Sequence, residues 1–124
     1  PDGILTNSSL GYVRTWLLSH FRLLAIVSLP PETFVPYGTG TKASLLCLLK
    51  NDQEREASSV EQDYSIFMAI VERIGYDLRG RPLVKKTQQA SGSSNETLSS
   101  LLDTDIPYII KQFSIFKADQ HLSF

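Results

Sequence analysis

Residues 23–29 read Leu-Leu-Ala-Ile-Val-Ser-Leu and are followed at once by Pro30-Pro31. Such a run, without alternation of polar and apolar side chains, is typical of a strand covered on both faces, as in a parallel sheet flanked by helices. Proline donates no ladder hydrogen bond, so the strand is predicted to end there. A second buried strand is predicted over 43–49, after a loop over 30–42. Because this loop contains no crossover helix, the two strands are expected to be antiparallel neighbours.

Helices are predicted on both sides of this strand pair. Residues 8–21 repeat apolar side chains at helical spacing. A second helix is predicted to begin at a capping box at Ser58 or Ser59 and to end before Gly75. Its apolar face would consist of Ile66, Phe67, Ile70 and Ile74.

The last part of the chain is predicted to hold a flexible loop and a third helix. Residues 87–100 are poor in apolar side chains and read as a flexible segment. The helix is predicted to begin at Thr104 or Asp105, with Pro107 in its first turn. Together these patterns indicate an α/β fold whose sheet is largely parallel and carries an antiparallel strand near its edge.

The composition is that of an ordinary globular domain. The chain has 124 residues and a net charge of -1, from 12 Lys and Arg against 13 Asp and Glu, so no overall basic field indicates nucleic acid. One cysteine, Cys47, and two histidines provide no disulfide framework and no metal site. Cys47 is expected to be a small buried side chain of the second strand. The longest apolar run is far shorter than the ~20 residues of a membrane span, and no signal peptide is visible. A cytoplasmic protein is expected.

Several blocks of sequence occur in an order and spacing that resemble a known family. They are Pro1-Asp2-Gly3-Ile4-Leu5, Arg14-Thr15-Trp16-Leu17-Leu18, Ala25-Ile26-Val27-Ser28-Leu29-Pro30, Phe34, Thr39-Gly40-Thr41-Lys42-Ala43-Ser44-Leu45-Leu46, Ile66-Phe67-Met68-Ala69, Ile74-Gly75-Tyr76-Asp77 and Arg79-Gly80. The family is that of the adenine-specific DNA methyltransferases, and the likeness is greatest to the methylation (M) subunits of type I restriction–modification systems. It covers roughly residues 1–82, with a weaker echo over 103–116.

The resemblance implies the last strands of a partial Rossmann-like catalytic sheet over 1–50 and a helical C-terminal extension over 51–124. It implies transfer of a methyl group from S-adenosylmethionine to a flipped adenine in double-stranded DNA. The family's glycine-containing cofactor motif is absent, and Leu29-Pro30-Pro31-Glu32 lacks the Asn and the aromatic residue of the family's catalytic motif. These 124 residues are therefore expected to hold no catalytic residue, to be inactive alone and not to bind S-adenosylmethionine. A missing N-terminal half would carry that chemistry.

Phe34 is the main candidate for a functional residue. In an open α/β sheet, ligands bind beyond the carboxyl ends of the parallel strands, and the loop over 30–42 follows such a strand. The resemblance implies that Phe34 stacks on the flipped adenine. Ordinary packing under the sheet edge is the alternative, and Tyr37 is the second candidate for stacking.

Further DNA contacts are expected from polar and basic residues. Thr39 and Gly40 could cradle a phosphate in a glycine-containing turn or form a plain turn, and Lys42 could meet a phosphate or stay solvated. The one notable basic cluster lies in residues 73–86 and could bind phosphates or form a solvated loop. Its candidate contacts are Arg79, Arg81, Lys85 and Lys86. His20 is expected to cap a helix rather than to act as a base.

A second class of function is left open by these patterns. The chain could be a non-catalytic interaction module or a truncated remnant that docks on a restriction–modification complex. A methyltransferase acting on RNA or protein is a lesser alternative. The expected partners are double-stranded DNA, the missing N-terminal half and specificity and restriction subunits. Because an incomplete sheet exposes an edge and an apolar face, the isolated chain is also expected to self-associate.

Overall fold

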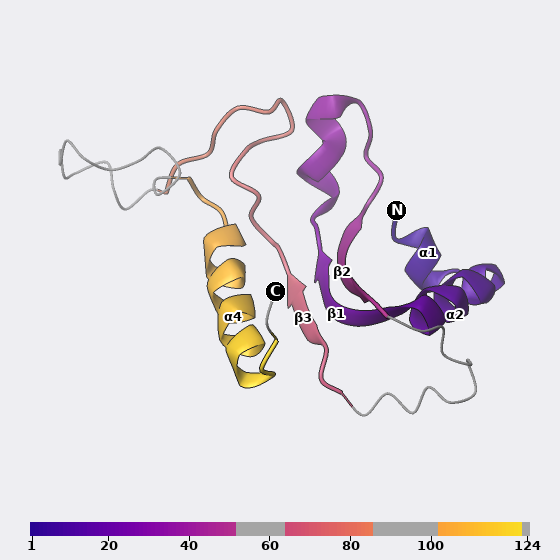
Figure 1. The fold of residues 1–124 in the computed structure, drawn as a ribbon. Helices are drawn as coiled ribbons and strands as arrows, with labels where there is room; N and C mark the ends of the chain where they lie inside the picture. The colour runs from indigo at the N-terminus through magenta and orange to yellow at the C-terminus, as the bar shows by residue number, and fades with distance from the viewer. Residues whose placement is uncertain (52–63, 86–101, 123–124) are drawn as a thin grey trace.

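A three-stranded mixed sheet is the centre of the computed structural model, which describes residues 1–51, 64–85 and 102–122 (Figure 1). The strand order is β2-β1-β3, with β1 (Phe21–Ser28) in the middle. β2 (Ser44–Lys50) pairs antiparallel with β1, which confirms the predicted neighbours. β3 (Phe67–Ile70) pairs parallel with β1 on its other side. The described part of the chain is therefore a mixed α/β structure.

Helices cover opposite faces of this sheet. α1 (Gly3–Thr6), η1 (Ser8–Leu10) and α2 (Gly11–His20) precede β1, and α4 (Ile106–Asp119) follows β3. Met68 lines a cavity together with Leu17 of α2, whereas Phe67 packs against Phe113 of α4 with ring centroids 5.4 Å apart. Successive strand residues point to opposite faces, so α2 and α4 lie on opposite faces. The predicted helices at 8–21 and after Thr104 are confirmed.

The predicted helix before Gly75 is wrong in its described part. Phe67–Ile70 is β3, and the N–H of Val71 donates to the carbonyl of Ser28 at 2.9 Å. Residues 66–71 are all apolar, so their pattern fits a buried strand as well as it fits the apolar face of a helix. The free edge of β1 supplies the pairing, and this tertiary contact decides between the two. The proposed capping box and the flexible loop over 87–100 lie outside the described residues.

The second predicted strand exists, but the prediction that it is buried on both faces is wrong. β2 is an edge strand, and α4 packs over β3 rather than over β2. Leu45, Cys47 and Leu49 are therefore exposed on that face of β2. The sequence run gave no sign of this, because burial of a strand depends on which elements cover it.

The connection between β1 and β2 contains a helical segment. The loop over 30–42 contains a short 3-10 helix, η2 (Pro31–Tyr37), which ends at Gly38 with a φ of 87°. The hydroxyl of Thr33 donates to the carbonyl of Pro30 at 2.7 Å and fastens the first turn.

The resemblance implied a boundary at residue 50, between the catalytic sheet and a C-terminal extension. β3 lies after residue 50 and pairs with β1, so the sheet extends across that boundary.

Candidate nucleic-acid interface

The carboxyl ends of β1 and β3 meet at one edge of the sheet. β1 leads into η2, and β3 leads into a connection over 71–85. Figure 1 shows η2 and this connection side by side beyond the strand ends. Since β1 and β3 are parallel, this is the edge at which open α/β sheets bind their ligands. The loop that carries Phe34 therefore lies where the sequence pattern predicts it.

The η2 helix and the 71–85 connection are fastened together at two points. The hydroxyl of Tyr76 donates to the carbonyl of Thr33 at 2.6 Å. Gly80, with a φ of 76°, lies so close to Pro36 that a Cβ there would stand 3.3 Å from the Cβ of Pro36. Burial, and then the nearby Tyr37, raise the pKa of Tyr76 above its usual range. The two segments thus form one continuous surface.

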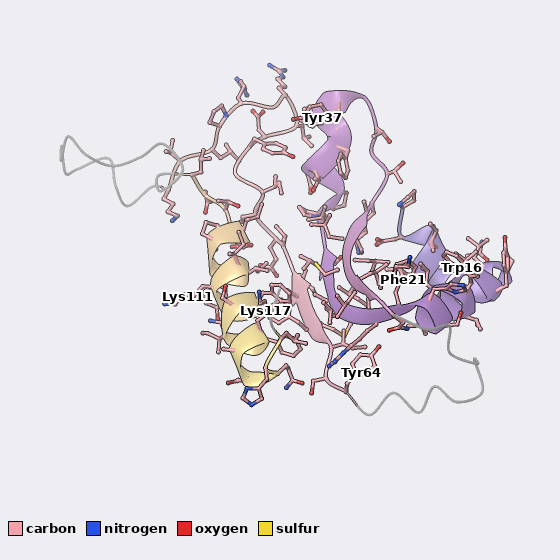
Figure 2. The ribbon with its side chains drawn as sticks, in the orientation of Figure 1. Trp16, Phe21, Tyr37, Tyr64, Lys111 and Lys117 are labelled. Atoms are coloured by element: carbon pink, nitrogen blue, oxygen red, sulfur yellow. The ribbon has the colours of Figure 1, made fainter. Side chains whose placement is uncertain are left out.

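Two aromatic side chains of η2 are open to solvent on this surface. Phe34 is 36% exposed, and Tyr37 is 78% exposed. Figure 2 shows Tyr37 on η2. The carbonyl of Phe34 accepts the N–H of Thr39 at 3.2 Å, which holds the end of η2. A base can stack only on a ring with an accessible face. Phe34 is partly covered by its neighbours, whereas most of the Tyr37 side chain is exposed to solvent.

Asp77 organises a tight turn beside η2. Its carboxylate accepts the backbone N–H groups of Arg79 and Arg81 at 2.8 and 2.9 Å, and the Nε of Arg81 at 2.8 Å. These contacts, led by the backbone and side chain of Arg81, lower the pKa of Asp77 from 3.8 to about 2. Arg81 is therefore neutralised by Asp77, to which it also forms an ion pair of 2.7 Å.

Arg79 is the basic candidate that the turn leaves available. Its backbone N–H is used by Asp77, but its exposed guanidinium has no partner among the described residues. Lys85 lies further along, after the bridge between Val84 and Leu102. Lys86 lies outside the described residues. Of the predicted basic cluster, the structure thus brings Arg79 and Arg81 to the η2 surface.

The residues at the end of the 30–42 loop are tied into the protein itself. Lys42 forms an ion pair of 3.3 Å with Asp2, whose carboxylate also accepts the hydroxyl of Ser44 at 2.7 Å. The hydrogen bond from Ser44, and then Lys42, lower the pKa of Asp2. The hydroxyl of Thr39 accepts the N–H of Thr41 at 3.3 Å, so this N–H is already occupied. A Cβ on Gly40, between them, would meet no atom within 4 Å.

The other candidates have structural surroundings. The Nδ1 of His20 lies 2.9 Å from the carbonyl of Trp16, and the two rings stack at 4.5 Å. The described residues hold no group of three or more His, Cys, Asp or Glu that could bind a metal ion. None of the helices in residues 1–51, 64–85 and 102–122 has the length and apolar character needed to cross a membrane.

Sequence reasoning missed Tyr76, which fastens the site together. Its partner, Thr33, lies 43 positions earlier in the chain, and no local pattern encodes such a contact. Comparison of the chain with models of protein families, with curated proteins and with solved structures gives no match in any of the three. The site is therefore defined by its own geometry: two exposed aromatic rings and one available guanidinium at the carboxyl ends of parallel strands.

Proposed function

We propose that this chain is part of a site-specific DNA adenine N6-methyltransferase and carries the side of the active site that holds the target base. The sequence resemblance supports this assignment and a place for the strands in a partial Rossmann-like sheet. One structural observation carries it further: Phe34, Tyr37 and Arg79 gather at the carboxyl ends of β1 and β3. Stacking rings beside a cation are what a flipped base and its phosphate need.

Each of these residues has a distinct role in the proposal. The adenine leaves the duplex and lies flat against Phe34, which replaces part of the stacking lost in the DNA. Arg79 binds a neighbouring phosphate and contributes a salt-dependent part of the affinity. Tyr76 and Gly80 hold the two segments in register, so that ring and guanidinium face the same strand of DNA.

In this proposal, S-adenosylmethionine binds outside the described residues. A methyl donor must lie beside the flipped adenine. Cavities of about 450 and 350 Å³ lie between β3 and α4 and between the sheet and α2, and neither includes a residue of η2. The donor site is therefore assigned to another part of the complete enzyme, and the chain alone is expected to be inactive.

DNA binding by the purified chain tests the proposal. The probes are a labelled duplex with one adenine opposite an abasic site, which lowers the cost of flipping, and the same duplex fully paired. We expect tighter binding of the first. Phe34→Ala should abolish this preference, a loss of roughly ten- to a hundredfold for a stacking energy of ~1–3 kcal/mol. Phe34→Trp keeps a flat ring and should retain most of it.

Matched variants separate the roles. Arg79→Ala should weaken binding of both duplexes and lower the salt dependence by about one released counterion. Lys111→Ala is the control, because Lys111 is an exposed cation on α4 (Figure 2). Equal losses for Arg79→Ala and Lys111→Ala, or an undiminished preference of Phe34→Ala for the duplex with the abasic site, would contradict the proposal.

A second candidate, a non-catalytic interaction module, is favoured by the apolar side chains that β2 exposes. Leu45 is 55% exposed and Leu49 is 41% exposed, and such a surface favours association. In the enzyme, other parts of the methyltransferase or its specificity and restriction subunits would cover it. The isolated chain is expected to self-associate, and Leu45→Lys should raise the dimer dissociation constant in sedimentation experiments. Leu83→Lys, in the 71–85 connection, is the control. A monomeric chain without affinity for DNA would contradict both candidates.

A further inference from the structure

The free edge of β3 and α4 form a groove apart from η2. Its volume is about 450 Å³, and it is lined by every residue of β3, by Glu72 and Asp105, and by Tyr108, Ile109 and Gln112 on α4. Successive strand residues point to opposite faces, so a groove that all four residues line must reach the strand backbone as well as its side chains. Met68 and Ile70 are 72% and 73% exposed.

The backbone of β3 presents hydrogen-bonding groups to this groove. The N–H of Val71 donates to Ser28 of β1. Because backbone groups alternate sides along a strand, the N–H and C=O of Met68 and Ile70 point away from β1. The next N–H in this alternation, that of Glu72, is taken by Asp105 at 3.0 Å. Within the described residues the edge is therefore open from Met68 to Ile70 and closed at Glu72.

The position of α4 determines what the groove can hold. Phe113 and Phe116 pack on Phe67, and Figure 1 shows α4 beside β3, on the side away from β1. An extended chain that pairs with the strand edge would lie in this groove. A second copy pairing through its own β3 would bring its own α4 into the same space. The geometry thus favours a peptide strand over a symmetric dimer at this edge.

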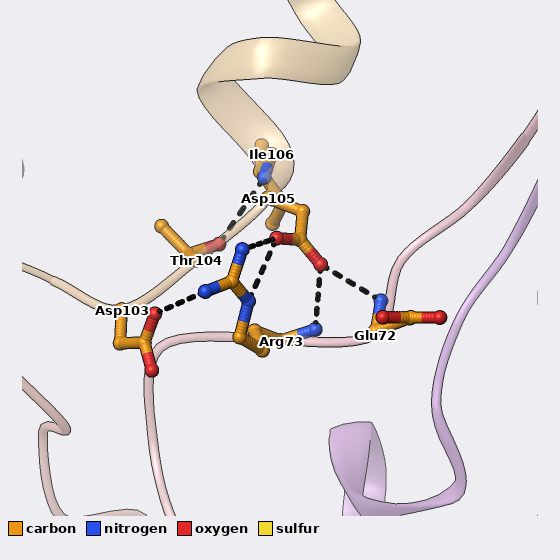
Figure 3. A network of polar contacts seen from close by, with 6 residues as sticks. All are labelled: Glu72, Arg73, Asp103, Thr104, Asp105 and Ile106. Carbon is orange, nitrogen blue, oxygen red and sulfur yellow. Dashed lines mark hydrogen bonds and ion pairs between the residues drawn. The ribbon is translucent and has the colours of Figure 1, made fainter. Parts of the chain in front are cut away.

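Charge at the closed end of the groove indicates the side chain that the peptide carries. Asp103 and Asp105 bind the guanidinium of Arg73, and the carboxylate of Glu72 lies to one side of this pair (Figure 3). Arg73 binds Asp103 at 3.0 Å and Asp105 at 2.6 Å. Three carboxylates against one cation leave negative charge in excess, which a basic side chain of a partner would complement.

We propose that this groove binds an extended peptide, which adds as a fourth strand to β3 and places a Lys or Arg beside Glu72. Main-chain hydrogen bonds to Met68 and Ile70 provide the affinity, as in other strand additions to a free sheet edge. The basic side chain at the Glu72 end sets the position of the peptide. This binding site does not depend on the proposed methyltransferase function.

Fluorescence anisotropy with synthetic peptides tests the proposal. The probes are labelled six-residue peptides of alternating Val and Thr with one terminal Arg, made with the Arg at either end. We expect one of them to bind saturably to the full chain. Methylation of alternate backbone nitrogens in that peptide should weaken binding at least tenfold, because it removes the ladder hydrogen bonds. Replacement of its Arg by Glu should weaken binding comparably.

Variants of the protein locate the site. Glu72→Gln should reduce the preference for Arg over Glu in the peptide, whereas Glu32→Gln, on η2, should leave it unchanged. Ile70→Pro removes an N–H that points away from β1 and should lower affinity tenfold with an unchanged circular dichroism spectrum. No saturable binding at millimolar peptide would overturn the proposal, as would equal binding of the methylated peptide. A dimer that Ile70→Pro dissociates would assign the edge to a second copy and overturn it too.

Discussion

Two aspartates of this protein each accept backbone N–H groups and an arginine guanidinium, but their partners differ in sequence separation. Asp77 accepts two backbone N–H groups and the guanidinium of Arg81, all within four residues. Asp105 accepts the N–H groups of Glu72 and Arg73 and the guanidinium of Arg73, about thirty residues away (Figure 3). The first network shapes a turn beside the candidate DNA site, and the second joins the start of α4 to the end of β3.

The sequence separation of the partners determines how much such a network contributes to stability. A contact within four residues can form in part before the rest of the chain folds, so unfolding loses little of it. A contact across thirty residues exists only when the tertiary structure does. Burial by itself would raise the pKa of Asp105, but hydrogen bonds from the backbone and side chain of Arg73 and from Glu72 outweigh it and lower the pKa. Its side chain is 16% exposed.

The largest effect is expected when the long-range network is removed. Asp105→Ala leaves the N–H groups of Glu72 and Arg73 without their acceptor and releases the start of α4. The free energy of unfolding should fall by about 1.5–3 kcal/mol, the range for hydrogen bonds to a charged group. Urea unfolding measures this, and hydrogen exchange should show faster opening of α4. Asp119→Ala, at the exposed end of the same helix, is the control. If both variants lose the same stability, the network does not dock the helix.

A neutral long-range contact should have an intermediate effect. Tyr76→Phe deletes only the hydroxyl that donates to Thr33, and we expect a loss of about 1–1.5 kcal/mol. Tyr37→Phe deletes an exposed hydroxyl and should change stability by less than about 0.5 kcal/mol. Thermal unfolding compares the two variants. Because the pKa of Tyr76 is raised, its contribution should be present below about pH 10 and lost as the pH rises further. Equal stability of both variants would show that the Tyr76 contact is not significant.

The smallest effect is expected for the local network, and it should appear in acid. The folded pKa of Asp77 is about 2 against an ordinary value of 3.8. Because part of this local contact persists in the unfolded chain, Asp77 contributes only a small stability above about pH 4, which is lost as the pH falls through 2. A carboxyl titration by NMR should give a midpoint near the lower value. Asp77→Asn should move the amide signals of Arg79 and Arg81 while the unfolding transition stays almost unchanged. A midpoint near 3.8 would show that the turn does not persist in solution.

Local patterns were enough for much of the fold. Apolar spacing located α2 and α4, and the uninterrupted runs, joined by a loop without a predicted crossover helix, identified β1 and β2 as antiparallel neighbours. The same reasoning placed the loop with Phe34 at the end of β1. It failed for β3, because residues 66–71 are apolar throughout and fit a helix face and a strand equally well.

The sequence by itself determined where chain segments begin, end and turn, since prolines, glycines and apolar spacing act within a few residues. Only the tertiary structure decided that Phe67–Ile70 is a strand, that β2 stands at an edge with Cys47 exposed, and that Tyr76 fastens η2 to the 77–81 turn. Each of these depends on a partner more than twenty residues away. Such partners are selected by the burial and hydrogen bonding of the whole fold, which no local window of sequence contains.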